Sequence, residues 1–236
     1  MSQLSVLILC GGKGTRIQSI LGSSPKILAP INDKLFLDYL FIWLQNSLPS
    51  VPLTFYLSTC IGHDLIQSYV SSSGLNCILS KEEVPLGTFG AILDVVSKNN
   101  ILGDILVLNG DTIFDVNFSS AYNKYLENTH YPLLIVKQAS IASRYGGYIF
   151  ANNQLKLSLG RPDYISLGAF FCSSSLLHNH FDKLLSKDLY LMLDKDFLDV
   201  SNCLPFILPH ETPFIDIGVP SDYSRAKDFI PSFLNR

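Results

Sequence analysis

The sequence predicts an α/β fold in which a mixed, mostly parallel central sheet is flanked by helices and extended by a smaller antiparallel portion. Two patterns lead to this prediction. Over residues 1–112, short apolar runs alternate with stretches whose apolar residues recur at helical spacing, as in βαβ units around a parallel sheet. Over residues 113–236, short strand-like runs follow one another with turn residues between them, which favours antiparallel pairing.

The elements predicted for the first half begin with a short, almost purely apolar strand that enters a glycine-rich turn. The strands are expected at 5–10, 53–58, 76–80 and 104–109, and the helices at 34–46, 63–70 and 87–98. The first of these helices carries apolar residues at helical spacing, and either Asn32 or Asp33 is its expected N-cap.

The second half is predicted to be richer in short strands. These are expected at 133–138, 147–150, 155–159, 165–171 and 205–208, with a helical stretch over 194–202. The sequence contains no recognisable linker, internal repeat or low-complexity segment. We therefore expect residues 1–236 to form a single domain, in which the second half packs on the same sheet.

The composition narrows the classes of function. Apolar residues make up 47% of the chain, enough for a sizeable core, and the formal net charge is −3. Because nucleic-acid binding usually needs a basic excess, we expect no nucleic-acid partner. No uncharged apolar run approaches the length of a membrane span, and the first residues lack a signal-peptide pattern. We therefore expect no membrane association and a cytoplasmic location.

The segment with the clearest chemical meaning is 9–16, which follows the first predicted strand. It contains three glycines, Gly11, Gly12 and Gly14, which let backbone N–H groups approach a phosphate chain. Arg16 and Lys26 supply positive charge for the phosphate oxygens. The spacing is neither the dinucleotide-binding fingerprint, since Ile17 stands where the third glycine would be, nor a Walker P-loop. Taken alone, the glycines could also form an ordinary turn.

Five segments, in order, resemble the signature of the sugar-1-phosphate nucleotidyltransferases. They are Gly-Gly-x-Gly-Thr-Arg followed by Pro-Lys (11–26), the acidic-Pro-Leu-Gly-Thr-x-Gly-Ala loop (82–91), Asn-Gly-Asp (109–111), Arg-Tyr-Gly (144–146) and Asp-x-Gly-x-Pro-x-Asp-Tyr (216–223). Segments 29–34, 109–112 and 214–223 are most similar to the short D-glycero-α-D-manno-heptose 1-phosphate guanylyltransferases. Mannose-1-phosphate guanylyltransferases and short uridylyl- and cytidylyltransferases are close alternatives.

The resemblance implies a Rossmann-like fold and a reaction. A nucleoside triphosphate and a heptose or hexose 1-phosphate would give a nucleotide-sugar for surface polysaccharide, with release of pyrophosphate and with Mg²⁺ as cofactor. Residues 1–112 would bind the nucleotide and 113–236 the sugar. The resemblance leaves a homodimer open.

The resemblance also implies roles for individual residues. The catalytic residues would be Arg16, Lys26 and Asp111, and the metal ligands Asp111 and Asp216. The nucleotide would be bound by Leu9, Gly11, Gly12, Gly14, Thr15, Glu82, Pro85, Gly87, Thr88, Asn109 and Gly110. The sugar phosphate would be bound by Tyr145, Gly146, Arg161, Ser166 and Gly168.

The chemistry of phosphoryl transfer fits these residue types. In-line attack on the α-phosphorus needs positioning and charge neutralisation more than covalent help. Two carboxylates from separate strand ends suit Mg²⁺, a hard cation that prefers oxygen ligands. Each residue alone also has a simpler interpretation: a turn aspartate for Asp111, a helix N-cap for Asp216 and a solvated lysine for Lys26.

The loop that begins at Glu82 favours a particular base. A carboxylate can accept hydrogen bonds from guanine N1–H and N2–H₂ together, whereas an amide suits uracil or thymine better. We therefore expect a preference for GTP, with Glu82 as the contact and Glu83 in reserve. The alternative is that backbone groups, rather than a glutamate side chain, form the hydrogen bonds that recognise the base.

The second half departs from the family pattern where the sugar should bind. The family carries a Glu-Lys pair and then Asn-x-Gly, whereas this chain has Gly160, Arg161 and Ser166 in the corresponding places. An arginine can still hold a phosphate through two hydrogen bonds. Two hypotheses follow: an active nucleotidyltransferase with an altered sugar site, or a silent homologue that binds a nucleotide-sugar and regulates a partner enzyme.

Overall fold

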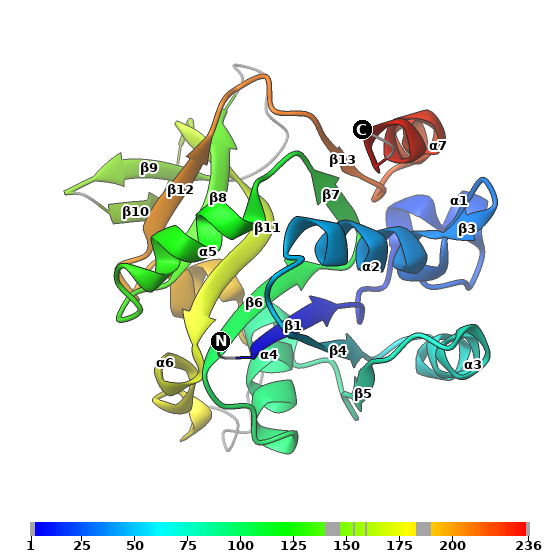
Figure 1. Ribbon diagram of the computed structural model, residues 1–236, viewed down its shortest axis with the longest axis horizontal. Helices are drawn as coiled ribbons and strands as arrows, with labels where there is room; N and C mark the ends of the chain where they lie inside the picture. The colour runs from blue at the N-terminus through cyan, green and yellow to red at the C-terminus, as the bar shows by residue number, and fades with distance from the viewer. Residues whose placement is uncertain (1–2, 140–146, 153, 159, 183–189, 235–236) are drawn as a thin grey trace.

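The computed structural model describes residues 3–139, 147–152, 154–158, 160–182 and 190–234. Its centre is a nine-stranded mixed sheet with helices on both faces (Figure 1). The parallel part consists of β1 (Leu4–Leu9), β4 (Leu53–Thr59), β5 (Ile78–Lys81) and β6 (Asp104–Asn109). Strand β1 lies between β4 and β6, and β5 pairs with the other side of β4. The predicted α/β class, with a mostly parallel sheet, is confirmed for this region.

The second half continues the same sheet. Its strands are β8 (Leu133–Gln138), β9 (Tyr148–Ala151), β10 (Gln154–Leu157), β11 (Tyr164–Ser173) and β12 (Leu204–Leu208). The long strand β11 runs antiparallel to β6, β8 and β9, and β10 runs antiparallel to β9. Strand β12 is parallel to β8. The predicted antiparallel portion therefore joins the parallel part directly, through β11 and β6.

The core lies in two layers because the central strands are buried on both faces. On β1, Val6 and Ile8 belong to one hydrophobic cluster and Leu7 belongs to the other. The first layer is covered by α2 (Phe36–Ser47), α3 (His63–Ser73), α5 (Phe118–Leu126) and α7 (Pro220–Leu234). The second is covered by α4 (Gly87–Lys98), α6 (Ser174–His178) and the π-helical turn η4 (Asp194–Leu198). Alternate side chains of a strand point to opposite faces, so an uninterrupted apolar run is what such a strand requires.

Short elements surround the ends of the sheet. They are η1 (Thr15–Ile17), α1 (Gln18–Leu21), η2 (Lys26–Leu28), β2 (Pro30–Ile31), β3 (Lys34–Leu35), β7 (Thr112–Phe114) and β13 (Phe214–Asp216). Strand β13 pairs antiparallel with β7, which directly follows β6. This pairing brings a segment from near the C-terminus to the end of the central strand.

Several predicted boundaries were wrong by a few residues, and one cap was wrong. The helix expected over 34–46 begins at Phe36, because Lys34 and Leu35 pair with β2. Its first turn is closed by Asp38, whose Oδ2 accepts a hydrogen bond from the Leu35 N–H at 2.8 Å. Neither Asn32 nor Asp33 caps it, since both lie in the turn between β2 and β3.

Other elements also differ from their predicted bounds; for example, β11 is three residues longer than predicted. Helix α3 extends to Ser73, β5 begins only at Ile78, and the helical stretch expected over 194–202 ends at Leu198. Strand β10 ends at Leu157, and residue 159 of the expected strand lies outside the described residues. By contrast, α4, β6 and β8 have the predicted bounds.

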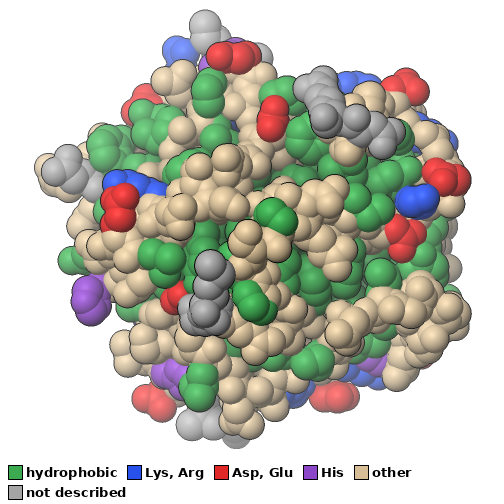
Figure 2. Space-filling model, in the orientation of Figure 1, with side chains coloured by type: hydrophobic (Ala, Val, Ile, Leu, Met, Phe, Trp, Pro, Cys, Tyr) green, Lys and Arg blue, Asp and Glu red, His purple; other side chains and the backbone are tan. Residues whose placement is uncertain are grey.

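The surface has no strong separation of charge on the face shown in Figure 2, where acidic and basic side chains are interspersed among hydrophobic ones. Within the described ranges, no helix is both long enough and apolar enough to cross a membrane.

Candidate active site

A cavity of about 630 Å³ lies where the parallel strands end. The carboxyl ends of parallel strands meet at one edge of a sheet, which is where ligands bind in open α/β folds. The cavity is lined by every residue predicted above for catalysis, metal binding and nucleotide binding: Leu9, Gly11, Gly12, Gly14, Thr15, Arg16, Lys26, Glu82, Pro85, Gly87, Thr88, Asn109, Gly110, Asp111 and Asp216. The fold therefore gathers these residues from segments that lie far apart in the chain.

The glycine-rich loop after β1 forms one wall. Gly14 has a φ of +60°, a left-handed conformation that L side chains rarely adopt, and it precedes η1. A Cβ at Gly14 would lie 3.3 Å from Lys26 Cγ, so the turn packs closely against that lysine. A Cβ added at Gly12 would have no neighbouring atom within 4 Å. The loop thus lines the cavity and packs against Lys26, which lines the same cavity.

Lys26 and Asp111 form an ion pair beside the glycine-rich loop. The ammonium Nζ of Lys26 contacts Oδ2 of Asp111, and the two side chains are 23% and 22% exposed. Thr112 Oγ1 donates to the other carboxylate oxygen of Asp111 at 3.2 Å. A positive charge is therefore held beside a carboxylate at the edge of the cavity, where the Lys26 ammonium group could contact a phosphate.

The two predicted metal ligands are brought together by the pairing of β13 with β7. Asp216 lies opposite Thr112 in this pairing, and the Ile217 N–H donates to the Asp111 carbonyl at 3.0 Å. The Gly218 N–H donates to Asp216 Oδ1 at 2.6 Å, which orients that carboxylate.

These two carboxylates fit a magnesium ion. Among the residues that the structure describes, no group of three His, Cys, Asp or Glu side chains could hold a metal. Mg²⁺ typically takes one or two protein carboxylates and completes its shell with phosphate oxygens and water. A pair of aspartates at the edge of a cavity that also carries Arg16 and Lys26 for phosphate oxygens matches this requirement.

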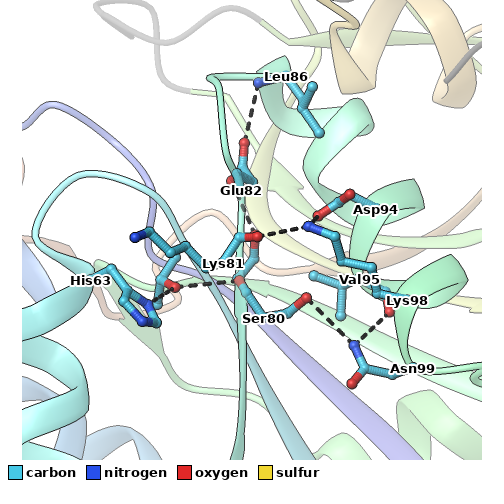
Figure 3. A network of polar contacts seen from close by, with 11 residues as sticks. His63, Ser80, Lys81, Glu82, Leu86, Asp94, Val95, Lys98 and Asn99 are labelled. Atoms are coloured by element: carbon cyan, nitrogen blue, oxygen red, sulfur yellow. Dashed lines mark hydrogen bonds and ion pairs between the residues drawn. The ribbon is translucent and has the colours of Figure 1, made fainter. Parts of the chain in front are cut away.

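The carboxylate of Glu82 is held in place by hydrogen bonds within the protein (Figure 3). Its side chain is buried, with one oxygen accepting from Ser58 Oγ and the other from the Leu86 N–H, both at 3.2 Å. Burial raises the pKa of this carboxyl group, and the hydrogen bonds from Leu86 and Ser58 oppose the shift. Glu82 therefore ties the 82–86 loop to β4, while its neighbour Glu83 is exposed.

The network around Glu82 extends to helix α4. Lys98 Nζ donates to the Lys81 carbonyl at 2.7 Å and pairs with Asp94 at 2.8 Å. Asn99 donates to Ser80 Oγ at 3.5 Å, and Figure 3 shows these contacts running along one side of β5. These contacts hold the start of the loop against the helix that follows it.

A smaller hollow of about 90 Å³ adjoins the cavity on the side of β11. Its lining comprises Asn109, Thr112, Ser166, Leu167, Gly168, Phe214 and Asp216. Strand β11 bulges between Ser166 and Ala169, and Ser166 Oγ accepts from the Gly168 N–H at 3.1 Å. Gly168 has a φ of +74°, and a Cβ there would clash with the Asn109 amide. The bulge therefore places the β11 backbone against the end of β6.

The structure does not gather all of the predicted sugar-side residues. Ser166 and Gly168 line the small hollow, but Arg161 lies on an exposed bend and lines neither this hollow nor the larger cavity. Tyr145 and Gly146 lie outside the described residues. The three predicted sugar-phosphate residues that the structure describes are thus divided between the hollow and a surface bend.

Sequence reasoning missed several residues of the large cavity. They are Cys10, Lys13, Ile27, Ser58, Cys60, Ile61, Ala91, Tyr190 and Gly218. Most adjoin a residue that was predicted, and Ser58, Cys60 and Ile61 lie at the end of β4, beside β1. Their position at the end of a predicted parallel strand was the signal that could have identified these three residues. Tyr190 comes from the second half, and no motif pointed to it.

Comparison with known proteins defines the class. The chain matches the model of the nucleotidyl transferase family over residues 5–159. It belongs to that family, as the five motifs indicated.

Individual relatives narrow the comparison. The chain is 31% identical over 228 residues to a D-glycero-alpha-D-manno-heptose 1-phosphate guanylyltransferase of Campylobacter jejuni, covering 93% of this chain and 97% of the relative. It is 28% identical to the enzyme of the same name from Aneurinibacillus thermoaerophilus, covering 98% and 100%. Among solved structures, HddC from Yersinia pseudotuberculosis complexed with GMP-PN is similar with a TM-score of 0.76 and 26% identity, covering 95% of this chain and 98% of that chain.

Proposed function

We propose that the protein is a sugar-1-phosphate guanylyltransferase that joins GTP to a heptose 1-phosphate and releases pyrophosphate. The observation that carries the proposal is the single cavity lined by all of the residues predicted for catalysis, metal binding and nucleotide binding. The names of the two relatives that match nearly the whole chain support the guanylyl group and the heptose. A hexose 1-phosphate is the alternative acceptor.

The proposed division of labour follows the two halves of the chain. Residues 1–112 bind the nucleotide, with backbone N–H groups of the glycine-rich loop and Arg16 directed at the phosphates. Residues 113–236 bind the sugar phosphate, with Ser166 and Gly168 at the small hollow beside Asn109. Tyr145 and Gly146 would complete the sugar side.

Asp111 and Asp216 would hold Mg²⁺ at the junction of the two sites. When bound, the metal ion would neutralise charge on the phosphates that react. Lys26 would add a second positive charge at the α-phosphate, where negative charge increases as the sugar phosphate oxygen attacks. Because Lys26 already contacts Asp111, its position is set by the same carboxylate that would bind the metal.

The product would be a nucleotide-activated sugar made in the cytoplasm for surface polysaccharide. Keeping both aspartates, Arg16 and Lys26 in one cavity argues for catalysis, because a silent nucleotide-sugar-binding homologue would not need both metal ligands.

The test is a pyrophosphate-release assay that crosses GTP, ATP, CTP and UTP with several sugar 1-phosphates in the presence of Mg²⁺. We expect release with GTP and a heptose 1-phosphate above all other pairs. Preference for CTP or UTP would remove the guanylyl assignment but keep the reaction class. No release with any pair, together with tight binding of a nucleotide-sugar, would favour the silent homologue.

A further inference from the structure

Tyr190 reaches the nucleotide cavity from an unexpected part of the chain. It belongs to the second half, yet it lines the same cavity as Pro85, Gly87 and Thr88. Its side chain is 69% exposed, so the ring lies at the cavity mouth with little protein covering it. An aromatic ring with a free face at a ligand-sized cavity has room for a flat partner.

The backbone next to Tyr190 is fixed to the loop that precedes α4. The Leu191 N–H donates to the Leu86 carbonyl at 2.9 Å, and the Phe89 N–H donates to the Leu191 carbonyl at 3.0 Å. Between these two bonds lies Gly87, with a φ of +76°, where a Cβ would clash with the Leu191 carbonyl. Glycine at position 87 therefore lets the segment that carries Tyr190 dock on this loop.

A second set of contacts holds the residues that follow Leu191. The Met192 N–H donates to Asp196 Oδ2 at 2.6 Å. Phe197 is fully buried and stacks on Phe89 of α4, with ring centroids 4.9 Å apart and an interplanar angle of 18°. Tyr190 is thus an exposed ring on an anchored backbone, an arrangement that lowers the entropy cost of binding.

We propose that Tyr190 stacks on the nucleobase and so forms one face of the base site. This inference rests on the proposed function, in that it takes the cavity to bind a nucleoside triphosphate. The uncharged ring adds no positive charge for the phosphates, which the glycine loop, Arg16 and Lys26 already supply with donors and charge. It lies instead beside Pro85 and Gly87, in the loop expected to address the base. Every base has a flat π face, and stacking on an aromatic side chain stabilises binding substantially.

The test separates the base from the phosphates. Calorimetric binding of a non-hydrolysable GTP analogue is compared with binding of inorganic triphosphate, which has no base, for wild type, Tyr190→Ala and Tyr190→Phe. We expect Tyr190→Ala to lose roughly tenfold in affinity for the analogue and to keep its affinity for triphosphate. Tyr190→Phe should bind both as wild type does. Met192→Ala is the matched control, since that side chain is exposed in the same segment but does not line the cavity.

Two results would overturn the inference. One is unchanged affinity of Tyr190→Ala for the GTP analogue. The other is an equal loss for analogue and triphosphate, which would mean that the substitution disturbs the whole site. The outcome is independent of the base preferred: if a CTP or UTP analogue binds best and shows the same selective loss, the guanylyl proposal fails while the role of Tyr190 stands. If GTP is preferred and Tyr190→Ala has no effect, the guanylyl proposal stands while the role of Tyr190 fails.

Discussion

The nucleotide side and the sugar side of this molecule are built differently. The large cavity is made by loops at the ends of adjacent parallel strands, and all of its predicted residues lie together. The small hollow depends on a bulge in β11 and on the approach of β13, and it contains only part of the predicted set. Parallel strand ends place their loops side by side automatically, whereas a bulge positions a backbone only through its neighbours. A site of the first kind can therefore be read more directly from sequence.

The largest expected effect is at the junction of the two sites. Asp111→Asn and Asp216→Asn should each lower kcat by about 10²–10³-fold or more, because each removes one anionic metal ligand while keeping its shape. Pyrophosphate release by the purified variants measures this, and Asp115→Asn, on an exposed carboxylate near β7, is the control. Near-normal turnover in either variant would mean that the metal is bound elsewhere, and that these two aspartates do not link the nucleotide site to the sugar site.

The next effect concerns the nucleotide side alone. Lys26→Ala should lower kcat by roughly 10²-fold while changing the affinity for a non-hydrolysable GTP analogue much less, because its charge acts on the transferring phosphate. Steady-state kinetics measure the loss of kcat, and calorimetry measures the loss of affinity for the GTP analogue. Lys34→Ala, which removes an exposed lysine outside the cavity, is the matched control. A rise in KM with kcat unchanged would make Lys26 a ground-state binding residue.

On the sugar side, Gly168→Ala tests whether the bulge positions the hollow. The added methyl group would clash with Asn109, so KM for the sugar 1-phosphate should rise roughly 10- to 100-fold. Affinity for the GTP analogue should fall by less, because Asn109 also lines the large cavity but Gly168 does not. Gly103→Ala is a close control, since Gly103 also has a positive φ but open space around its Cβ. If both variants behave alike, backbone strain rather than the contact with Asn109 explains the effect.

A smaller effect concerns stability at the base loop. Burial raises the pKa of Glu82 in the folded protein, so the stability that its protonated form contributes is present at low pH and is lost as pH rises through the raised pKa. Wild type should therefore lose unfolding free energy relative to Glu82→Gln as pH rises from below the ordinary glutamate range, about 4.3, towards neutral. Urea titrations at a series of pH values measure the difference. Glu83→Gln, on the exposed neighbour, controls for the loss of one charge, and a constant difference for Glu82→Gln would contradict the argument.

The smallest expected effect is that of Arg161→Ala. Arg161 was predicted to replace the family lysine at the sugar phosphate, but its place on an exposed bend outside both cavities leads us to expect a change of less than about threefold in kcat/KM. Kinetics with varied sugar 1-phosphate measure it. A large loss that Arg161→Lys partly restores would extend the sugar site to this bend and narrow the contrast between the two sides.

The elements that sequence predicted best are those whose signals are local and complete. Helix α4 has a clear apolar stripe and begins at a glycine, and β6 is a strand that is apolar through its middle; both have the predicted bounds. Helix α5 was missed, although Asn117 caps it by accepting a hydrogen bond from the Ser120 N–H at 2.8 Å. The start of α2 was misplaced because the pairing of β3 with β2, which precedes it, depends on a tight turn.

The α/β class, the family and many of the residues at the ends of the parallel strands could be predicted from the sequence alone. These follow from apolar periodicity and from short motifs, each contained within a few neighbouring residues. The tertiary structure decided what depends on segments far apart in the chain: the meeting of Asp216 with Asp111, the partners of Glu82, the exposure of Arg161 and the arrival of Tyr190 beside Gly87. Such contacts depend on strand pairing and on the packing of one backbone segment against another. A local sequence pattern does not specify which distant segment will pack at a given place.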